Sequence, residues 1–282
     1  MKLRAVAFGL AMAGLAVAIA GVLLWRRDAR TDAHLAQRFS QRALPPPSTR
    51  LDCALLKAAN PVVLLALGQS NAGNHGTPTG PSPSVTVITD RGECHRVVDP
   101  LPGATGTGGS IWARLPDALQ AEGSHRAWVI AVLAVDATTV EDWADAKGPI
   151  ARALGQQLRH MNAAGMPPDF VLWQQGEANA RLGTDAMEYA AGLRAVASAA
   201  RLQGFAGPWL LAKSTVCRSP PSRPIRAAID QLALEEPTRF LQGPDTDTLL
   251  PPDARSDGCH LSESGLRQAA TAWAQSITQH AK

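Results

Sequence analysis

The sequence has no block of lysine and arginine residues, and its formal net charge of +3 is small. A nucleic-acid partner is therefore not expected, because such proteins usually present a dense basic patch. No Cys-x-x-Cys pair occurs, which argues against a zinc ribbon. His-x-x-x-His pairs and glutamate clusters are absent too, so we expect neither a metal nor a cofactor.

The chain has 282 residues, of which 45% are hydrophobic, and no internal repeat. This composition is typical of a globular protein. Without an N-terminal segment, roughly 230 residues remain, which suits one α/β domain with a substantial core.

The N-terminal segment is apolar and carries no charge from Ala5 to Trp25. As a helix it would be about 31 Å long, which matches the hydrocarbon core of a bilayer. We expect residues 1–27 to be an uncleaved membrane anchor, so that the protein contacts the membrane through this helix. A cleaved signal peptide is the alternative, because Ala18–Ala20 resembles a cleavage site.

The four cysteines all lie outside this segment, and an even number of them suits two disulfides in an oxidising compartment. Three pairings are possible. We expect Cys53–Cys94 and Cys217–Cys259, because each would link segments that flank the candidate site described below; four reduced thiols are the alternative. The expected location is the bacterial inner membrane with the domain in the periplasm, or outside the cell after cleavage.

Residues 28–50 are polar and contain three successive prolines, which predicts a linker that stiffens near its end. The catalytic domain is expected at 51–282. There, apolar runs alternate with amphipathic stretches. The expected strands are Val62–Leu67, Val85–Thr89, Ala127–Val135, Phe170–Gln174 and Trp209–Lys213. The expected helices are Ser110–Glu122, Pro149–Ala164, Thr184–Gln203, Ser222–Glu235 and Ser262–His280.

This alternation predicts an α/β fold, a three-layer α/β/α sandwich around a parallel sheet. Ligands of such sheets bind beyond the carboxyl ends of the strands. Ser70 and Gln175 each follow an expected strand and should lie at that edge.

Ser70 stands in a Gly-Gln-Ser-Asn motif directly after the first strand, where a nucleophile would be presented at the sheet edge. An ordinary serine capping a helix is the alternative.

Near the other end of the chain, Asp257 and His260 are separated by two residues, so a tight turn would let the carboxylate orient the imidazole. A solvated loop histidine is the alternative there. A disulfide from Cys259 would brace this loop.

Four segments, in order along the chain, resemble the conserved blocks of the SGNH hydrolases, in the branch related to sialate O-acetylesterases and plant carbohydrate acetylesterases. They are Gly68–Asn71, Gly108–Leu115, Trp173–Ala178 and Asp257–His260. The resemblance covers the chain from Leu51 to its C-terminus. It implies a flavodoxin-like SGNH hydrolase fold and a serine esterase mechanism.

In that family the triad roles would fall to Ser70 as nucleophile, His260 as general base and Asp257 as its orienting partner. The oxyanion hole would combine the Ser70 amide, the Gly109 amide and the Gln175 side chain, where a donor is needed for the developing negative charge.

Other residues are supporting candidates. Gly108 competes with Gly109, and Asn71 would order the turn after Ser70. Glu177 is expected to hold the backbone of the site, with substrate contact as the alternative.

One segment departs from the family pattern, which often has a Gly-Gly-Thr-like turn before a tryptophan. Asp136 and Ala137 replace the flexible glycines there, so substrate preference is open. His75 and His95 are expected to be surface histidines, and Arg114 to pair with a carboxylate on a helix surface.

The sequence therefore predicts a serine esterase that removes short acyl groups, acetyl in particular, from a carbohydrate. A polysaccharide O-acetyltransferase with the same triad is one alternative, and a catalytically silent carbohydrate-binding protein is another. The oligomeric state is left open.

Overall fold

The computed structural model describes residues 33–250 and 252–281. Residues 33–40 are helical and belong to the first of two units, and the second, compact unit is Gln41–Lys282. No helix within the described ranges is long and apolar enough to cross a membrane. The expected anchor at residues 1–27 lies outside the described residues.

The compact unit is built on a sheet whose strand order is β1-β4-β3-β5-β2-β6-β7-β8 in the described chain. The strands are β1 (Arg50–Leu51), β2 (Val62–Gly68), β3 (Val85–Ile88), β4 (Cys94–Val97), β5 (Trp128–Ala134), β6 (Phe170–Gln174), β7 (Trp209–Lys213) and β8 (Phe240–Asp245). All neighbours from β3 to β8 through β5, β2, β6 and β7 are parallel.

The sheet is mostly rather than wholly parallel, which corrects the sequence-based expectation. β4 pairs with both β3 and β1 in the antiparallel sense. The reason is local: a tight turn joins β3 directly to β4, with no crossover helix between them. Two neighbouring strands joined in this way must run in opposite directions.

β2 is a central strand, and all seven of its residues are buried. Alternate side chains of a strand point to opposite faces of the sheet. Because both faces are covered here, every residue of β2 is buried and the sequence of the strand is continuously apolar. The chain adds β3 and β5 on one side of β2 and then β6, β7 and β8 on the other. The order therefore reverses beside β2, which is where open α/β sheets form a crevice at their carboxyl edge.

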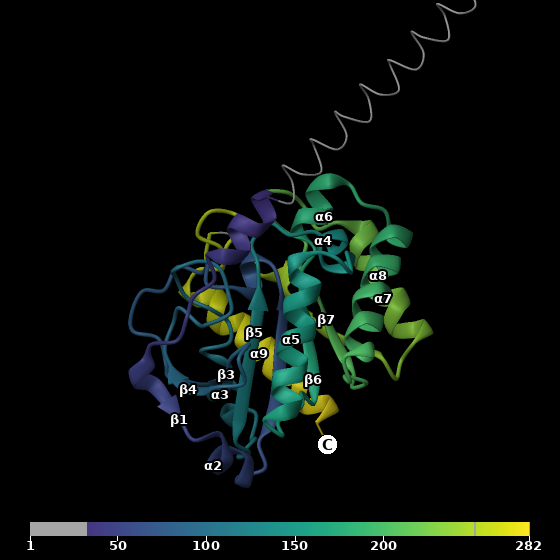
Figure 1. Cartoon of the computed structure of the whole chain (residues 1–282). Helices are drawn as coiled ribbons and strands as arrows, with labels where there is room; N and C mark the ends of the chain where they lie inside the picture. The colour runs from purple at the N-terminus through teal and green to yellow at the C-terminus, as the bar shows by residue number, and fades with distance from the viewer. Residues whose placement is uncertain (1–32, 251, 282) are drawn as a thin grey trace, which may run out of the picture. The chain divides into compact units, whose positions relative to one another are not determined.

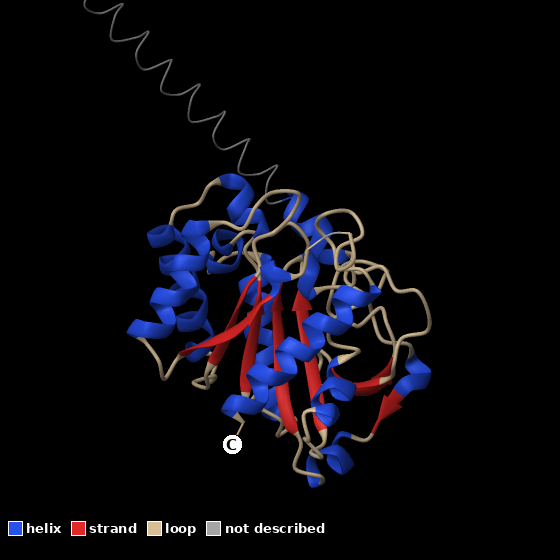
Figure 2. Cartoon of the chain, turned by 180° about the vertical axis from the view of Figure 1, so that it is seen from behind, coloured by secondary structure: helices blue, strands red, loops and turns tan. Residues whose placement is uncertain are grey.

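Helices cover both faces of this sheet. The helices of the described compact unit are α2 (Cys53–Ala58), α3 (Leu115–Ala121), α4 (Val140–Ala144), α5 (Pro149–Ala163), α6 (Glu177–Leu182), α7 (Ala186–Leu202), α8 (Arg223–Glu235) and α9 (Glu263–His280). Figure 1 shows α5 in front of the strands. The opposite view shows the long helix that ends at the C-terminus, α9, crossing the other face (Figure 2).

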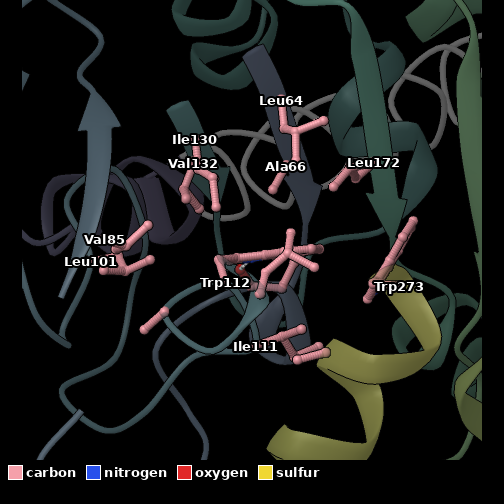
Figure 3. Packing of buried hydrophobic residues seen from close by; sticks show 14 of the residues in the cluster. Leu64, Ala66, Val85, Leu101, Ile111, Trp112, Ile130, Val132, Leu172 and Trp273 are labelled. Atoms are coloured by element: carbon pink, nitrogen blue, oxygen red, sulfur yellow. Dashed lines mark hydrogen bonds between the residues drawn. The ribbon is translucent and has the colours of Figure 1, made fainter. Parts of the chain in front are cut away.

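Two tryptophans fill the space between the sheet and α9, and both are fully buried. The rings of Trp112 and Trp273 lie 5.6 Å apart and pack below Leu64 and Ala66 of β2 (Figure 3). Their indole nitrogens both donate hydrogen bonds: Trp112 to the Ala72 carbonyl at 2.7 Å, and Trp273 to the Gln174 side chain at 3.1 Å. The core is thus hydrogen-bonded to two segments that adjoin the carboxyl edge of the sheet.

Most expected elements occur with small shifts at their ends. α3 begins at Leu115 rather than at Ser110, because Ile111–Arg114 forms a turn and Pro116 suits the first helical turn. α7 is capped by Asp185 rather than by Thr184, and Asp185 forms a capping box with Glu188.

Candidate active site

Ser70 lies at the carboxyl end of β2, where the chain turns sharply. Gly68 has a φ of +150°, and a Cβ there would approach the Gln174 carbonyl oxygen to 2.0 Å. Only glycine allows this close approach of two backbones. A short 3-10 turn, η2 (Ser70–Ala72), follows, and the Ser70 residue is 5% exposed.

His260 lies in a loop before α9 and is held by Asp257. The His260 Nδ1 to Asp257 Oδ2 distance is 2.9 Å. The other carboxylate oxygen accepts the amide hydrogens of Cys259 at 2.9 Å and His260 at 2.7 Å. Partial burial raises the pKa of Asp257, but these two amides and the His260 ring together outweigh it and hold that pKa well below its usual range. Asp257 is therefore an anion that fixes the imidazole with Nε2 free to face away from it.

The loop is attached to the segment after β7 by several bonds. A disulfide joins Cys217 to Cys259, and the Arg218 amide donates to the Gly258 carbonyl at 2.8 Å. The Arg218 guanidinium also lies 3.2 Å from Asp257 Oδ2, the oxygen that faces His260. A second disulfide joins Cys53 to Cys94, far from this loop in the strand order. These are the two pairs expected from the sequence, but the expectation that both would flank the site is wrong for Cys53–Cys94, since only Cys217 and Cys259 line the cavity described next. Disulfides of this kind suit an extracytoplasmic compartment.

Ser70 and His260 line one cavity of about 210 Å³ at the carboxyl edge of the sheet. The full lining comprises Gln69, Ser70, His75, Asp136, Ala137, Glu177, Ala178, Arg181, Cys217, Arg218, Cys259 and His260. The structure thus brings together a serine and a histidine that are separated by 190 residues, with the Asp257 carboxylate on the ring nitrogen of that histidine.

Asn71 and Glu177 connect the serine turn to the histidine loop. The Asn71 side chain donates to Glu177 Oε1 at 2.7 Å and to the Cys259 carbonyl at 3.2 Å. Glu177 Oε1 also accepts from Ser214 at 2.8 Å, whereas Glu177 Oε2 is buried and has no hydrogen-bond partner among the residues that the structure describes. Burial raises the pKa of Glu177 despite these hydrogen bonds.

Three other expected site residues do not reach the cavity. The amides of Gly108 and Gly109 donate to the Asn74 carbonyl at 2.7 Å and the Gly76 carbonyl at 2.9 Å. Gln175 is fully buried, and its nitrogen lies within hydrogen-bonding distance of three acceptors. The resemblance to the conserved family segments predicted that these residues lie near the site. Only the tertiary structure shows that their N–H groups already donate to acceptors within the protein.

His75 belongs to the site, although the sequence suggested a surface residue. Its ring stacks on that of His260 with the centroids 5.4 Å apart and an angle of 24° between the planes. Burial lowers the pKa of His75, the nearby Asp136 opposes this, and His260 lowers it further. His75 is therefore favoured as a neutral ring against His260. Its only signal in the sequence was its position soon after Ser70.

Ala137 shows the consequence of the departure from the family pattern. It lines the cavity with a φ of +54°, the left-handed region that glycine adopts most easily. The missing glycine is thus replaced by a residue in the same unusual conformation. Within the described part of the chain, no group of acidic, histidine or cysteine side chains is arranged to hold a metal ion.

No protein-family model matches the sequence, and the search of curated proteins found no match. Among solved structures, the fold is similar to that of a protein from Arabidopsis thaliana, with a TM-score of 0.62 and 18% identity over 78% of this chain and 99% of that one. An aryl esterase from M. smegmatis and a carbohydrate acetylesterase from Sinorhizobium meliloti each align with a TM-score of 0.49 and 14% identity, over 77% of this chain and 99% of theirs.

The likeness to the Arabidopsis protein shows a shared fold. That fold is mixed α/β, with a mostly parallel sheet flanked by helices.

Proposed function

We propose that this chain is a serine esterase of the SGNH hydrolase superfamily, in the branch related to sialate O-acetylesterases and plant carbohydrate acetylesterases. The observation that carries the proposal is the cavity shared by Ser70 and His260, with Asp257 hydrogen-bonded to the imidazole. The fold supports it as well, because the serine follows the central strand at the point where the strand order reverses.

In the proposed reaction, His260 Nε2 takes the proton of Ser70 as the serine oxygen attacks the ester carbonyl. The anionic Asp257 stabilises the imidazolium that forms. His260 then gives the proton to the leaving alcohol, and an acyl-enzyme remains on Ser70. His260 next activates a water molecule, which releases the acid and restores the serine.

The proposed substrate is a carbohydrate that carries short acyl groups, acetyl in particular. The cavity volume of about 210 Å³ suits a small acyl group rather than a long chain.

The proposed organisation is an anchor or signal peptide at 1–27, a linker at 28–50 and the catalytic domain at 51–282. The two disulfides support a domain outside the cytoplasm, in the periplasm when the anchor is kept or secreted when it is cleaved.

Hydrolysis of an aryl acetate by the purified protein tests the proposal. We expect Ser70→Ala to lower kcat by about 10⁴-fold or more, because no other group on the triad can form the acyl-enzyme. Ser198→Ala, which changes an exposed serine on α7, is the matched control and should leave the rate unchanged. Equal rates for wild type and Ser70→Ala would overturn the esterase proposal.

Acyl transfer to a sugar is the second candidate, since the same triad could pass the acyl group to a polysaccharide hydroxyl. The His260 side chain is 28% exposed, so a sugar hydroxyl can approach the acyl-enzyme from solvent. Incubation of the enzyme with an acetyl donor and an oligosaccharide separates the two: free acetate supports hydrolysis, and acetylated oligosaccharide supports transfer.

A further inference from the structure

The imidazole of His260 is hydrogen-bonded at one edge only. Within the described chain, its ring has a single hydrogen-bond partner, Asp257, at Nδ1. The torsion that turns a histidine ring about its bond to Cβ is broad, so one bond at an edge does not fix the plane of the ring. The side chain is also partly exposed, so the protein does not enclose it. The orientation of Nε2 therefore depends on what packs against the face of the ring.

His75 packs against that face. The two rings are nearly parallel, with 24° between their planes and 5.4 Å between their centroids, which is an offset stack. His75 follows the turn that carries Ser70, whereas His260 precedes α9. Both rings line the same cavity as Ser70. The stack thus connects the ring of the proposed base directly to the segment of the proposed nucleophile.

Thr105 fixes the His75 ring and its protonation. The Thr105 hydroxyl lies 3.2 Å from His75 Nε2, and its oxygen accepts the Asp136 amide hydrogen at 3.0 Å. Thr105 is buried, and among the described residues His75 Nε2 is the only acceptor for its hydroxyl hydrogen. The hydroxyl therefore donates to Nε2, so this nitrogen carries no hydrogen and His75 is a neutral ring protonated at Nδ1.

The backbone beside His75 leaves the ring little freedom. Gly106 has a φ of +93°, and a Cβ there would lie 2.8 Å from His75 Cδ2 and 2.3 Å from the Asn74 carbonyl oxygen. Glycine therefore allows the loop to close against one edge of the ring. With Thr105 on Nε2 and Gly106 at the adjacent edge, the His75 ring is a fixed surface for His260.

Several segments bring charged or titratable groups to the two rings. They are Asp136 after β5, Glu177 and Arg181 of α6, Arg218 after β7, and Asp257 beside His260. Asp136 favours a charged His75, whereas burial and the neighbouring His260 favour the neutral form. The neutral form suits the reaction, because His260 becomes a cation when it takes the serine proton and a second cation against its face would oppose this.

We propose that His75 is a positioning residue for the general base: its neutral ring, fixed by Thr105, holds the plane of the His260 imidazole so that Nε2 faces Ser70. This inference rests on the proposed esterase function. His75 itself takes no proton. The proton of Ser70 goes to His260 Nε2 and from there to the leaving alcohol, and His75 acts only through the contact between the rings.

Two substitutions of His75 separate a planar support from mere bulk. His75→Phe keeps a flat ring that cannot ionise, and His75→Leu keeps an apolar side chain without a plane. We expect His75→Phe to retain kcat on an aryl acetate within about threefold, and His75→Leu to lower it by about 10–10²-fold, because catalysis is sensitive to small misplacements of the base. KM should change by less than about threefold in both. His125→Leu, at an exposed histidine, is the control and should leave kcat unchanged.

The pH profile tests the neutral state of His75, which a merely structural role would not affect. The acid limb of kcat/KM reports the pKa of the base in the free enzyme. Replacing a neutral ring by phenylalanine should move this limb by less than about 0.5 pH unit. If His75 were a cation, its loss would raise the apparent pKa of His260, so a larger upward shift in His75→Phe would overturn the proposal.

Thr105→Val tests the part of Thr105 without removing either ring. It should lower kcat by about threefold or more in the wild-type background but not beside His75→Phe, since phenylalanine makes no bond to the hydroxyl. Equal losses in the two backgrounds would contradict the proposal, and this comparison decides alone if thermal unfolding shows that His75→Leu does not fold.

The remaining outcomes distinguish this inference from the function on which it rests. Wild-type kcat in His75→Leu, or an equal loss in His75→Phe and His75→Leu, would refute the positioning role while an inactive Ser70→Ala upheld the esterase. An active Ser70→Ala would refute the esterase function itself.

Discussion

At the scale of single residues, the site depends on buried polar side chains whose hydrogen bonds join distant segments. Glu177 is the clearest case, because it is 2% exposed and holds both the serine turn, through Asn71, and the segment after β7, through Ser214. Such a group stabilises the site through its bonds and at the same time makes stability depend on its protonation.

Glu177→Gln should change how the stability of the protein depends on pH. Burial raises the pKa of Glu177 in the folded protein, so the unfolded chain ionises first as the pH rises. Stability present at pH values below the ordinary pKa of glutamate is therefore lost as the pH rises through the folded-state pKa. Glutamine keeps an oxygen for Asn71 and Ser214 and does not ionise. The melting temperature of the variant relative to wild type should rise as the pH increases above the ordinary pKa of glutamate, about 4.3.

Thermal unfolding at several pH values measures this difference. Glu122→Gln removes the same charge from an exposed surface residue and serves as the control. A difference between Glu177→Gln and wild type that stays constant or falls with pH would contradict the role of ionisation at this residue.

At the scale of elements, the carboxyl edge of the sheet is assembled from loops, and a disulfide fixes the loop that carries His260. The two disulfides of the described chain close segments of nearly equal length, with separations of 42 residues for Cys217–Cys259 and 41 for Cys53–Cys94. One adjoins the site and the other ties β4 to α2. Their effects on stability should be alike, and their effects on activity should differ.

Removal of each disulfide by paired serine substitutions tests this expectation. A cross-link that closes a loop of this length contributes about 2–4 kcal/mol to the free energy of unfolding, mainly by restricting the unfolded chain. Both double variants should lose a similar amount in denaturant unfolding. Only Cys217→Ser with Cys259→Ser should also lower kcat on an aryl acetate, because it releases the His260 loop. Equal kcat in the two double variants would show that the loop needs no brace.

The sequence predicted the central elements well and the peripheral ones poorly. β6 and β7 have the predicted bounds, because continuous apolar runs mark strands covered on both faces. β8 was not expected, since it contains Gly243 and Pro244; the sheet tolerates them because β8 is an edge strand that pairs only with β7. α4 and α6 are too short to show a helical period.

At the scale of the whole molecule, Arg114 connects parts of the chain that lie far apart in sequence. It was expected on a helix surface, yet its side chain is 3% exposed and forms ion pairs with Asp99 at 2.8 Å and Glu263 at 2.7 Å. Glu263 is the first residue of α9, so this cluster anchors the helix that follows the His260 loop.

Arg114→Met should destabilise the protein by about 3–5 kcal/mol, because it leaves the buried Asp99 carboxylate without this counter-charge and Glu263 with Arg267 alone. Arg194→Met is the matched control. Arg194 also pairs with two carboxylates, Glu235 and Glu236, but its side chain is 37% exposed, so the expected cost is about 1 kcal/mol or less. Urea unfolding of both variants measures the difference, and equal losses would contradict the role of burial.

The sequence by itself determined the alternation of the central strands with the long helices, the place of Ser70 at the end of the central strand, and the pairing of Asp257 with His260. These follow from local patterns, in which neighbouring residues decide the outcome. The tertiary structure alone decided that His75 stacks on His260, and that the side-chain nitrogen of Gln175 is already hydrogen-bonded within the protein. The reason is that a hydrogen atom is available to a substrate only when no acceptor elsewhere in the fold has bound it, and those acceptors come from residues such as Thr138 and Asn179, which only folding brings to the side chain of Gln175.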